Sequence, residues 1–313
     1  MARTASKEVV RVGNEDVPLS HLDKLFFPPT GHSDGITKGD LVGYYRQVAP
    51  RMLGYLKDRP LVMERYPDGI GGERIVQKNA GSHFPDWITR AEVPKQGGTV
   101  LHVIADKPAT LVYLANQASI EFHVFLSRLD AIDQPDQIIF DLDPPDAEGF
   151  GDACRTALRL RGLLEDELGL AAYVKTTGGK GLHVHLPIRP GEDFDPVRDF
   201  ARGTAEVLAA RYPDELTTEP RKNQRGSRLY LDVMRNAYAQ TAVAPFAVRA
   251  RPGAPVATPL DWAEVGDQNI RPRDFTIATI SERPERSADP WAGMSRHRRG
   301  LSAPRRRLAD LRQ

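Results

Sequence analysis

The residues best suited to chemistry are two aspartates in the segment FDLDPP, from Phe140 to Pro145. Side chains alternate between the two faces of a strand, so we expect Asp141 and Asp143 on one face and Leu142 on the other. Two carboxylates on one face repel each other unless a cation lies between them. Mg²⁺ and similar hard ions take such oxygen ligands together with substrate phosphates. The pair indicates a metal site, although a solvated acidic turn shares the same pattern.

A third aspartate lies in a separate strand-like segment, RLYLDVMRN. Leu229, Leu231 and Val233 alternate there with other residues, which puts Asp232 on the polar face of a half-buried strand. Aspartate is disfavoured within strands, so we expect it to have a partner. Three aspartates on neighbouring strands can hold two metal ions, which clamp the attacking and leaving oxygens of a phosphoryl displacement.

A glycine-rich turn, KTTGGKGLHVHLP, supplies groups that suit phosphate. Its glycines let the backbone approach a ligand closely, while Thr177 and Lys180 offer a hydroxyl and a cation. Its order and spacing differ from those of a Walker A loop. His183, directly after the turn, is the candidate site histidine. His185 shares its strand face and fits a structural role, because the sequence offers no convincing third ligand for zinc.

Regular elements must position these groups. We predict helices over residues 37–48, 153–168 and 195–208, with a capping pair at Thr37 and Asp40 and a stop at Gly169. Strands are predicted over residues 137–143, 172–176, 182–188 and 228–234. This alternation favours an α/β or α+β core with a sheet backed by helices. We expect residues 251–273 to form loops and regular structure to fade beyond Trp291.

Composition sets broader limits. The 313 residues are 40% hydrophobic, which suffices for one large domain or two tightly packed smaller ones. The single cysteine, Cys154, excludes an intrachain disulfide and a cysteine-based zinc site, and it fits a reducing compartment. The sequence has no apolar run of the roughly 20 residues that span a bilayer. Its first residues lack the apolar core of a signal peptide, so we expect a soluble, cytoplasmic protein.

The net charge is only +1, but the basic residues are clustered. Residues 296–313 contain seven arginines and one acid, Asp310. A second cluster consists of Arg221, Lys222, Arg225 and Arg228. Such clusters are solvated surface or a tail unless a catalytic site lies nearby, in which case phosphate binding is the better interpretation.

A series of short motifs follows in order along the chain: LDKLFFP, YPDG, QKNA, FPDW, NQASIEFH, FDLDPP, TTGGKGLH and LYLDVMRN. Together they resemble the polymerase domain of bacterial ligase D. That domain is a branch of the archaeo-eukaryotic primase superfamily. The resemblance runs from about residue 8 to residue 295. It implies a primase-like catalytic core with a central mixed or antiparallel sheet flanked by helices. It implies one primase-polymerase domain over residues 1–295 and a basic tail over residues 296–313. Within the domain, residues 8–100 would bind DNA and its 5′-phosphate, and residues 101–290 would form the catalytic core.

The resemblance assigns roles to individual residues. Asp141, Asp143 and Asp232 match the three metal-binding, catalytic aspartates. Nucleotide binding falls to His123, Arg65, Arg249, Thr177, Lys180 and His183, of which the last three match the Ser, Lys and His that hold the triphosphate. Lys24 and Lys38 match two lysines that recognise a 5′-phosphate, and His21 stands where asparagine is usual. The DNA or template would be held by Arg225, Lys222 and Lys78.

Some positions depart from the family pattern. Glu64 stands where some members have lysine, so we expect the nucleotide or template to be held differently there. Ile75 and Val76 stand where relatives often have aromatic residues. Base stacking on an aromatic ring is worth roughly 1–3 kcal/mol per base, so we expect template grip at this point to be weaker or differently arranged.

The resemblance implies a DNA repair primase-polymerase that adds nucleotides to primer 3′ ends at 5′-phosphorylated gaps or double-strand breaks. It implies a preference for ribonucleotides and two divalent ions, Mn²⁺ or Mg²⁺. The expected partners are gapped or broken DNA and nucleoside triphosphates, with Ku and a separate DNA ligase as further candidates. Because no ligase segment follows, we expect a stand-alone monomeric polymerase, bacterial, without membrane contact and associated with the nucleoid.

Two alternative functions belong to other classes. One is a DNA end-binding module whose polymerase site has decayed, but a pure binding surface gains nothing from three aspartates near phosphate. The other is a metallophosphoesterase that uses His183, His185 and the aspartates. The lysine–glycine turn fits triphosphate binding better than it fits that reaction.

Overall fold

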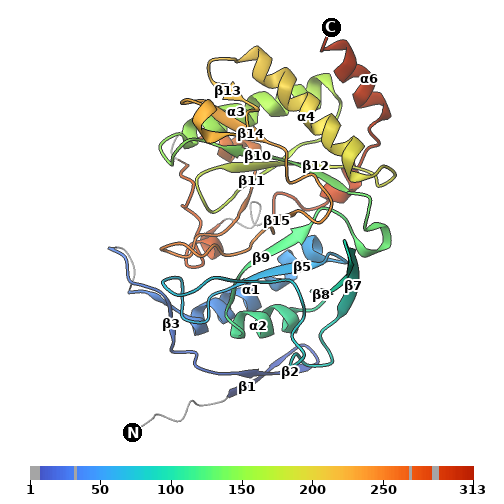
Figure 1. The fold of residues 1–313 in the computed structure, drawn as a ribbon. Helices are drawn as coiled ribbons and strands as arrows, with labels where there is room; N and C mark the ends of the chain where they lie inside the picture. The colour runs from blue at the N-terminus through green and yellow to red at the C-terminus, as the bar shows by residue number, and fades with distance from the viewer. Residues whose placement is uncertain (1–7, 32–33, 268–269, 284–288) are drawn as a thin grey trace. The chain divides into compact units, whose positions relative to one another are not determined.

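The computed structural model describes residues 8–31, 34–267, 270–283 and 289–313. The chain forms two compact units and passes between them several times (Figure 1). The first unit contains Met1–Phe125, Val243–Ala257 and Thr276–Ile280, and the second contains Leu126–Ala242, Thr258–Phe275 and Ser281–Gln313.

The second unit is built on a six-stranded sheet with the order β13-β14-β10-β12-β11-β16. The β13–β14 pair is parallel and the other four pairs are antiparallel. The predicted mixed or antiparallel sheet flanked by helices is confirmed, and it is mixed. The strands span Leu216–Thr217 (β13), Leu229–Asp232 (β14), Gln137–Asp143 (β10), Leu182–Pro187 (β12), Tyr173–Thr176 (β11) and Pro259–Leu260 (β16).

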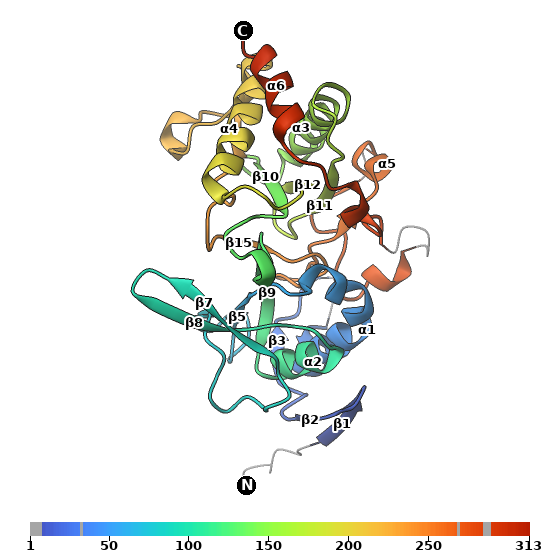
Figure 2. The ribbon, with the colours of Figure 1, turned by 90° about the vertical axis from the view of Figure 1, so that its right-hand side faces the viewer.

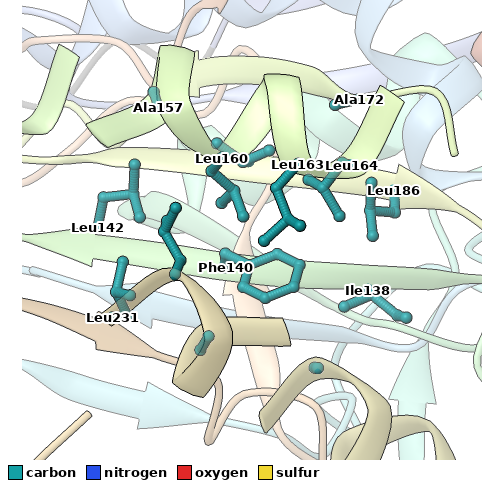
Figure 3. Packing of buried hydrophobic residues seen from close by; sticks show 14 of the residues in the cluster. Ile138, Phe140, Leu142, Ala157, Leu160, Leu163, Leu164, Ala172, Leu186 and Leu231 are labelled. Carbon is teal, nitrogen blue, oxygen red and sulfur yellow. The ribbon is translucent and has the colours of Figure 1, made fainter. Parts of the chain in front are cut away.

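Helices cover one face of this sheet. Both α3 (Phe150–Gly162), which continues into the π-helical turn Leu163–Glu167, and α4 (Phe194–Arg211) contact β10. Figure 3 shows Phe140 and Leu142 of β10 in one apolar cluster with Leu160 of α3. Because side chains alternate along β10, the two aspartates of that strand face away from this helical layer.

The first unit contains β9, β5 and β6 of a four-stranded sheet with the order β15-β9-β5-β6, and two neighbouring helices, α1 and α2 (Figure 2). The edge strand β15 joins this unit at Val243. Helix α1 begins after Thr37, whose side chain and that of Asp40 form the predicted capping box. Three two-stranded sheets complete the unit. The elements span Glu8–Val12 (β1), Glu15–Leu19 (β2), Leu25–Phe27 (β3), Ile36–Thr37 (β4), Lys38–Leu56 (α1), Leu61–Arg65 (β5), Ile75–Gln77 (β6), Arg90–Lys95 (β7), Gly98–Val103 (β8), Pro108–Asn116 (α2), Ser119–Phe125 (β9) and Thr241–Val243 (β15).

Two expectations about the C-terminal part are wrong. Regular structure continues beyond Trp291 in helix α6 (Ser302–Asp310). This helix packs on α4 and buries Pro304 and Leu308. Residues 251–273 are not loops throughout, since they contain β16 and the short helix α5 (Trp262–Val265). Short helical turns span Leu129–Ala131 (η1), Lys222–Gln224 (η3), Ile280–Glu282 (η4) and Met294–His297 (η6).

Helices of the described ranges fall short of the length and apolar character that a bilayer-spanning segment requires.

Candidate functional site

Four strands of the second unit carry a row of ionisable side chains on the face turned away from α3 and α4. Backbone pairing sets Lys175 opposite His183, and His183 opposite Asp141. It also sets Asp141 opposite Asp232. Asp143 lies two residues further along β10, on the same face as Asp141. The register of the sheet therefore brings the three aspartates to one patch.

Asp141 is nearly buried, with 13% of its side chain exposed. Nε of Arg235 donates to its Oδ2 at 2.9 Å, and Nε2 of His183 lies 3.4 Å from the same oxygen. Burial disfavours the charged carboxylate, but the His183 hydrogen bond and the Arg235 charge outweigh burial and hold the pKa of Asp141 well below its usual range. Burial, together with the charge of Lys175, lowers the pKa of His183 to about 3, so this ring is neutral at pH 7.

The pKa of Asp232 is shifted in the opposite direction from that of Asp141. Burial raises its pKa, and the charge of Asp141 adds to the rise, although a hydrogen bond from the Met234 N–H at 2.8 Å opposes it. A divalent cation relieves this kind of carboxylate repulsion, so the donor set fits a hard ion.

Asp143 lies beside two cations. Nζ of Lys180 is 3.1 Å from its Oδ1, and a terminal nitrogen of Arg225 is 3.8 Å from its Oδ2. The Arg225 guanidinium also stacks on the Tyr230 ring, at 3.7 Å from the ring centroid. The basic cluster noted in the sequence thus reaches the aspartate patch through Arg225, while Lys222 stays exposed in η3.

The glycine-rich turn between β11 and β12 is fixed by its own hydrogen bonds. The Thr177 hydroxyl donates to the Gly181 carbonyl at 3.1 Å and accepts from the Gly179 N–H at 3.2 Å. Lys180 donates to the Pro145 carbonyl at 3.0 Å, which folds its side chain over the end of β10. The turn therefore presents Lys180 to the aspartate patch.

His185 makes structural contacts. It is 3% exposed, its Nδ1 lies 3.1 Å from Oε1 of Gln137, and its ring centroid is 4.7 Å from that of Trp291. These contacts favour the structural role expected for His185.

In the first unit, His123 and Arg249 meet at one carboxylate, that of Glu121 in β9. Arg249 donates to Glu121 through Nε at 2.7 Å, and Nε2 of His123 lies 3.1 Å from the same Oε2. Burial would raise the pKa of Glu121, but His123, Arg249 and the Ala250 N–H lower it to about 2. Glu64, opposite Glu121 in β5, lies 3.5 Å from His123.

One group of three acidic or histidine side chains within the described ranges has ligand atoms close enough to hold a metal ion. It consists of Glu64, Glu121 and His123, whose ligand atoms all lie within 4.8 Å of one another. The sequence predicts metal at the aspartates instead. Here Arg74 and Arg249 already form ion pairs with the two glutamates.

Lys24 and Lys38 lie near each other in the first unit. The Lys38 N–H donates to the Lys24 carbonyl at 2.8 Å, and Nζ of Lys38 donates to the Ser20 carbonyl at 2.5 Å. Nζ of Lys24 forms an ion pair with Asp68 at 2.7 Å. His21 begins the same turn with a positive φ of 53° and is exposed.

The remaining predicted residues of the first unit lie elsewhere. Arg65 donates to the Gln117 carbonyl at 2.7 Å and to the Gln77 side chain at 2.8 Å. Lys78 is exposed after β6, and the departures Ile75 and Val76 are exposed on β6 at 38% and 49%.

Sequence reasoning missed Arg235 and Glu121. Arg235 follows Asp232 by three residues, and the end of the strand pattern gave no sign that its side chain turns back to Asp141. Glu121 had a usable signal, because it lies two residues before His123 in a strand and therefore on the same face. Its contact with Arg249, 128 positions away, has no local signature.

The fold is that of a polymerase domain. The solved structure described as "Polymerase Domain from Mycobacterium tuberculosis Ligase D in complex with DNA" matches with a TM-score of 0.82 and 30% identity, covering 90% of this chain and 98% of that chain. The family described as "LigD, primase-polymerase domain" matches residues 37–291. The chain belongs to this family, which confirms the resemblance seen in its motifs.

Curated relatives include longer proteins. The "Multifunctional non-homologous end joining protein LigD" of Mycolicibacterium smegmatis is 32% identical over 82% of this chain. The "Bifunctional non-homologous end joining protein LigD" of Bacillus subtilis is 32% identical over 87% of this chain. The matched region spans 33% and 43% of those two proteins, respectively.

Proposed function

We propose that this protein is a nucleotidyltransferase that adds nucleotides, with ribonucleotides preferred, to primer 3′ ends at 5′-phosphorylated gaps or breaks in DNA. The observation that carries the proposal is the pairing of Asp141 with Asp232 on adjacent strands, with Asp143 and Lys180 beside them. Membership of the primase-polymerase family and the DNA-bound structural relative support the same activity.

The three aspartates would hold two divalent ions, Mn²⁺ or Mg²⁺. When bound, such ions activate the primer hydroxyl as a nucleophile and stabilise the pyrophosphate leaving group. Arg235 and His183 keep Asp141 ionised, which is the form that a hard cation requires.

The chain's own cations and donors would hold the triphosphate. Lys180 would offset its charge, and the Thr177 hydroxyl would donate a hydrogen bond to it in place of its present bond to the Gly181 carbonyl. We also assign nucleotide binding to His183 of the second unit and to His123, Arg65 and Arg249 of the first unit. The primer 3′-hydroxyl then attacks the α-phosphate in line, and pyrophosphate leaves.

Lys24 and Lys38 would bind the 5′-phosphate on the far side of a gap, with His21 as a third contact. Two lysines close together, one at the end of the turn from His21 and one at the start of α1, are expected to attract a phosphate dianion. Arg225, Lys222 and Lys78 would contact the DNA backbone or template. The names of the relatives favour end joining as the pathway. Ku and a separate ligase are our candidate partners.

The central test is the double variant Asp141→Ala, Asp143→Ala. Primer extension on gapped DNA should fall to background, while binding to the same DNA, measured by fluorescence anisotropy, should persist. The control is Asp130→Ala, Asp133→Ala, which removes two exposed aspartates of the same unit and should leave extension unchanged. Extension by the first variant at the wild-type rate would refute the proposed function.

A second test concerns the 5′-phosphate. Lys24→Ala should weaken binding to 5′-phosphorylated gaps more than binding to gaps ending in 5′-hydroxyl, because it removes a cation aimed at that phosphate. The matched control is Lys95→Ala, at an exposed lysine on β7. Equal losses on both DNA substrates would reject this role for Lys24.

A further inference from the structure

The Glu121 carboxylate accepts from three donors that belong to two distant parts of the first unit. Its Oε1 accepts from the Ala250 N–H at 2.8 Å. Its Oε2 accepts from Nε of Arg249 at 2.7 Å and lies 3.1 Å from Nε2 of His123. The Glu121 side chain thus binds both the backbone N–H of Ala250 and the side chain of Arg249.

The position of Glu121 in the sheet is energetically unfavourable for a charged carboxylate, because it is buried and faces another glutamate. It is 4% exposed, and Glu64 lies directly opposite it in the β5–β9 pairing. Like charges directly opposite each other destabilise a sheet, and a buried carboxylate persists only when its acceptors are filled. Arg74 pairs with Glu64, and Arg249 pairs with Glu121, so each carboxylate has its own cation. The result is a charge-balanced group rather than an acidic cluster.

We infer that Glu121 is a positioning residue for nucleotide binding, which sets Arg249 and His123 at a fixed spacing through its single carboxylate. This inference rests on the proposed function, because that function assigns Arg249 and His123 to the nucleotide. Glu121 itself acts through those two residues and the Ala250 backbone. An arginine and a histidine held in advance lose less conformational freedom when the triphosphate binds, so affinity for nucleotide rises.

Glutamine cannot replace Glu121 in this role. An amide has one acceptor oxygen and one NH₂ group, which only donates. If the NH₂ takes the place of Oε1, it meets the Ala250 N–H. If it takes the place of Oε2, it meets Nε of Arg249, which is always a donor. Either orientation leaves a donor facing a donor, so Glu121→Gln must loosen Arg249 or its backbone.

The experiment is steady-state incorporation of a nucleoside triphosphate on saturating gapped DNA. Glu121→Gln should raise KM for the nucleotide about tenfold and change kcat by less than about twofold, as expected for lost binding that precedes the chemical step. The matched control is Asp136→Asn. Asp136 is another buried carboxylate, 1% exposed at its side chain and bound by Arg128 and Arg298 in the second unit. It should lower thermal stability without this selective change in KM.

A double-mutant cycle separates positioning from a merely structural effect. In an Arg249→Ala background, Glu121→Gln should raise KM by less than about twofold further, because its main route of action is already gone. Additive effects in the cycle would overturn the inference. So would equal KM changes in Glu121→Gln and Asp136→Asn. A lower KM in Glu121→Gln would also overturn it, because Glu121 would then oppose triphosphate binding by its charge.

Failure of the proposed function gives a different result. If the wild-type protein does not extend primers, that function is wrong, and the inference is tested by direct binding of a fluorescent ATP analogue. Wild-type binding that is about tenfold tighter than that of Glu121→Gln would support the positioning role. Equal affinities would overturn it.

Discussion

Lys38 is a buried lysine at the first turn of α1, close to a second lysine. It is 6% exposed, and burial together with the charge of Lys24 lowers its pKa to about 8. A lysine is charged below its pKa and neutral above it, so Lys38 loses its charge within a range that a binding assay can reach. The 5′-phosphate remains a dianion throughout that range, because its second pKa is about 6.

The preference for a 5′-phosphate should therefore fall as pH rises through 8. We expect the affinity ratio between phosphorylated and unphosphorylated gaps to fall several-fold between pH 7 and pH 9.5. In Lys38→Arg the ratio should stay nearly constant, because arginine keeps its charge in this range. Anisotropy titrations on both DNA substrates at four pH values measure this. The same pH profile in wild type and Lys38→Arg would assign the titration to another group.

Residue patterns were enough to predict which side chains share a strand face or a turn. They did not predict contacts between segments that are distant in the sequence. Alternation was enough to place Asp141 and Asp143 on one face of β10. It gave no register between β10 and β14, so the pairing of Asp141 with Asp232 came from the structure. Arg235 lies outside any repeating pattern, since its orientation depends on the turn that follows β14.

Among the elements, the turn into β12 depends on one glycine. A Cβ at Gly181 would collide with the Leu142 carbonyl oxygen of β10. The neighbouring strand can approach this closely only because glycine has no side chain. The same register pairs Leu182 with Leu142 and, two residues after Gly181, His183 with Asp141.

Gly181→Ala should therefore separate β12 from β10 at the site. We expect it to lower the free energy of unfolding by about 3 kcal/mol and to reduce primer extension at a temperature where the protein stays folded. The control is Gly151→Ala in α3, where a Cβ would meet only the Arg155 side chain at an ordinary contact distance of 4.0 Å, and alanine should stabilise the helix by up to about 1 kcal/mol. Chemical denaturation measures both values. A stability loss below 1 kcal/mol in Gly181→Ala would contradict the steric argument.

Elements with a strong local pattern were predicted to within a few residues. The predicted strand over residues 137–143 coincides with β10, and the capping box places the start of α1. Helix α6 was missed because it carries only Pro304 and Leu308 as buried residues among several arginines. Such a helix is stabilised by tertiary packing, which local sequence does not report.

At the scale of the whole molecule, the first unit is not a continuous stretch of chain. Its N-terminal part ends at Phe125, and Val243–Ala257 returns later to complete it. That returning segment contributes Phe246, which is fully buried and whose carbonyl accepts from the Tyr44 hydroxyl at 2.7 Å. It also contributes Val248, whose N–H donates to the Tyr45 hydroxyl at 3.0 Å.

A fragment of residues 1–125 should therefore not unfold cooperatively, because its core lacks Phe246 and Val248 and the Tyr44 hydroxyl loses its acceptor, the Phe246 carbonyl. Joining residues 243–257 to it through a flexible Gly/Ser linker should restore a cooperative thermal transition. Circular dichroism melting curves compare the two. A sharp transition in the shorter fragment would show that the returning segment is dispensable.

The same chain path has a consequence for synthesis in the cell. About 155 residues must be added after Phe125 before Ile280 completes the first unit. Because ribosomes add roughly 5–20 residues per second, this takes roughly 8–30 seconds. During that interval the nascent chain exposes the surface that Phe246 will later cover. We expect slow-translating codons or a shortage of chaperone to reduce the yield of this protein more than that of a protein with sequential domains.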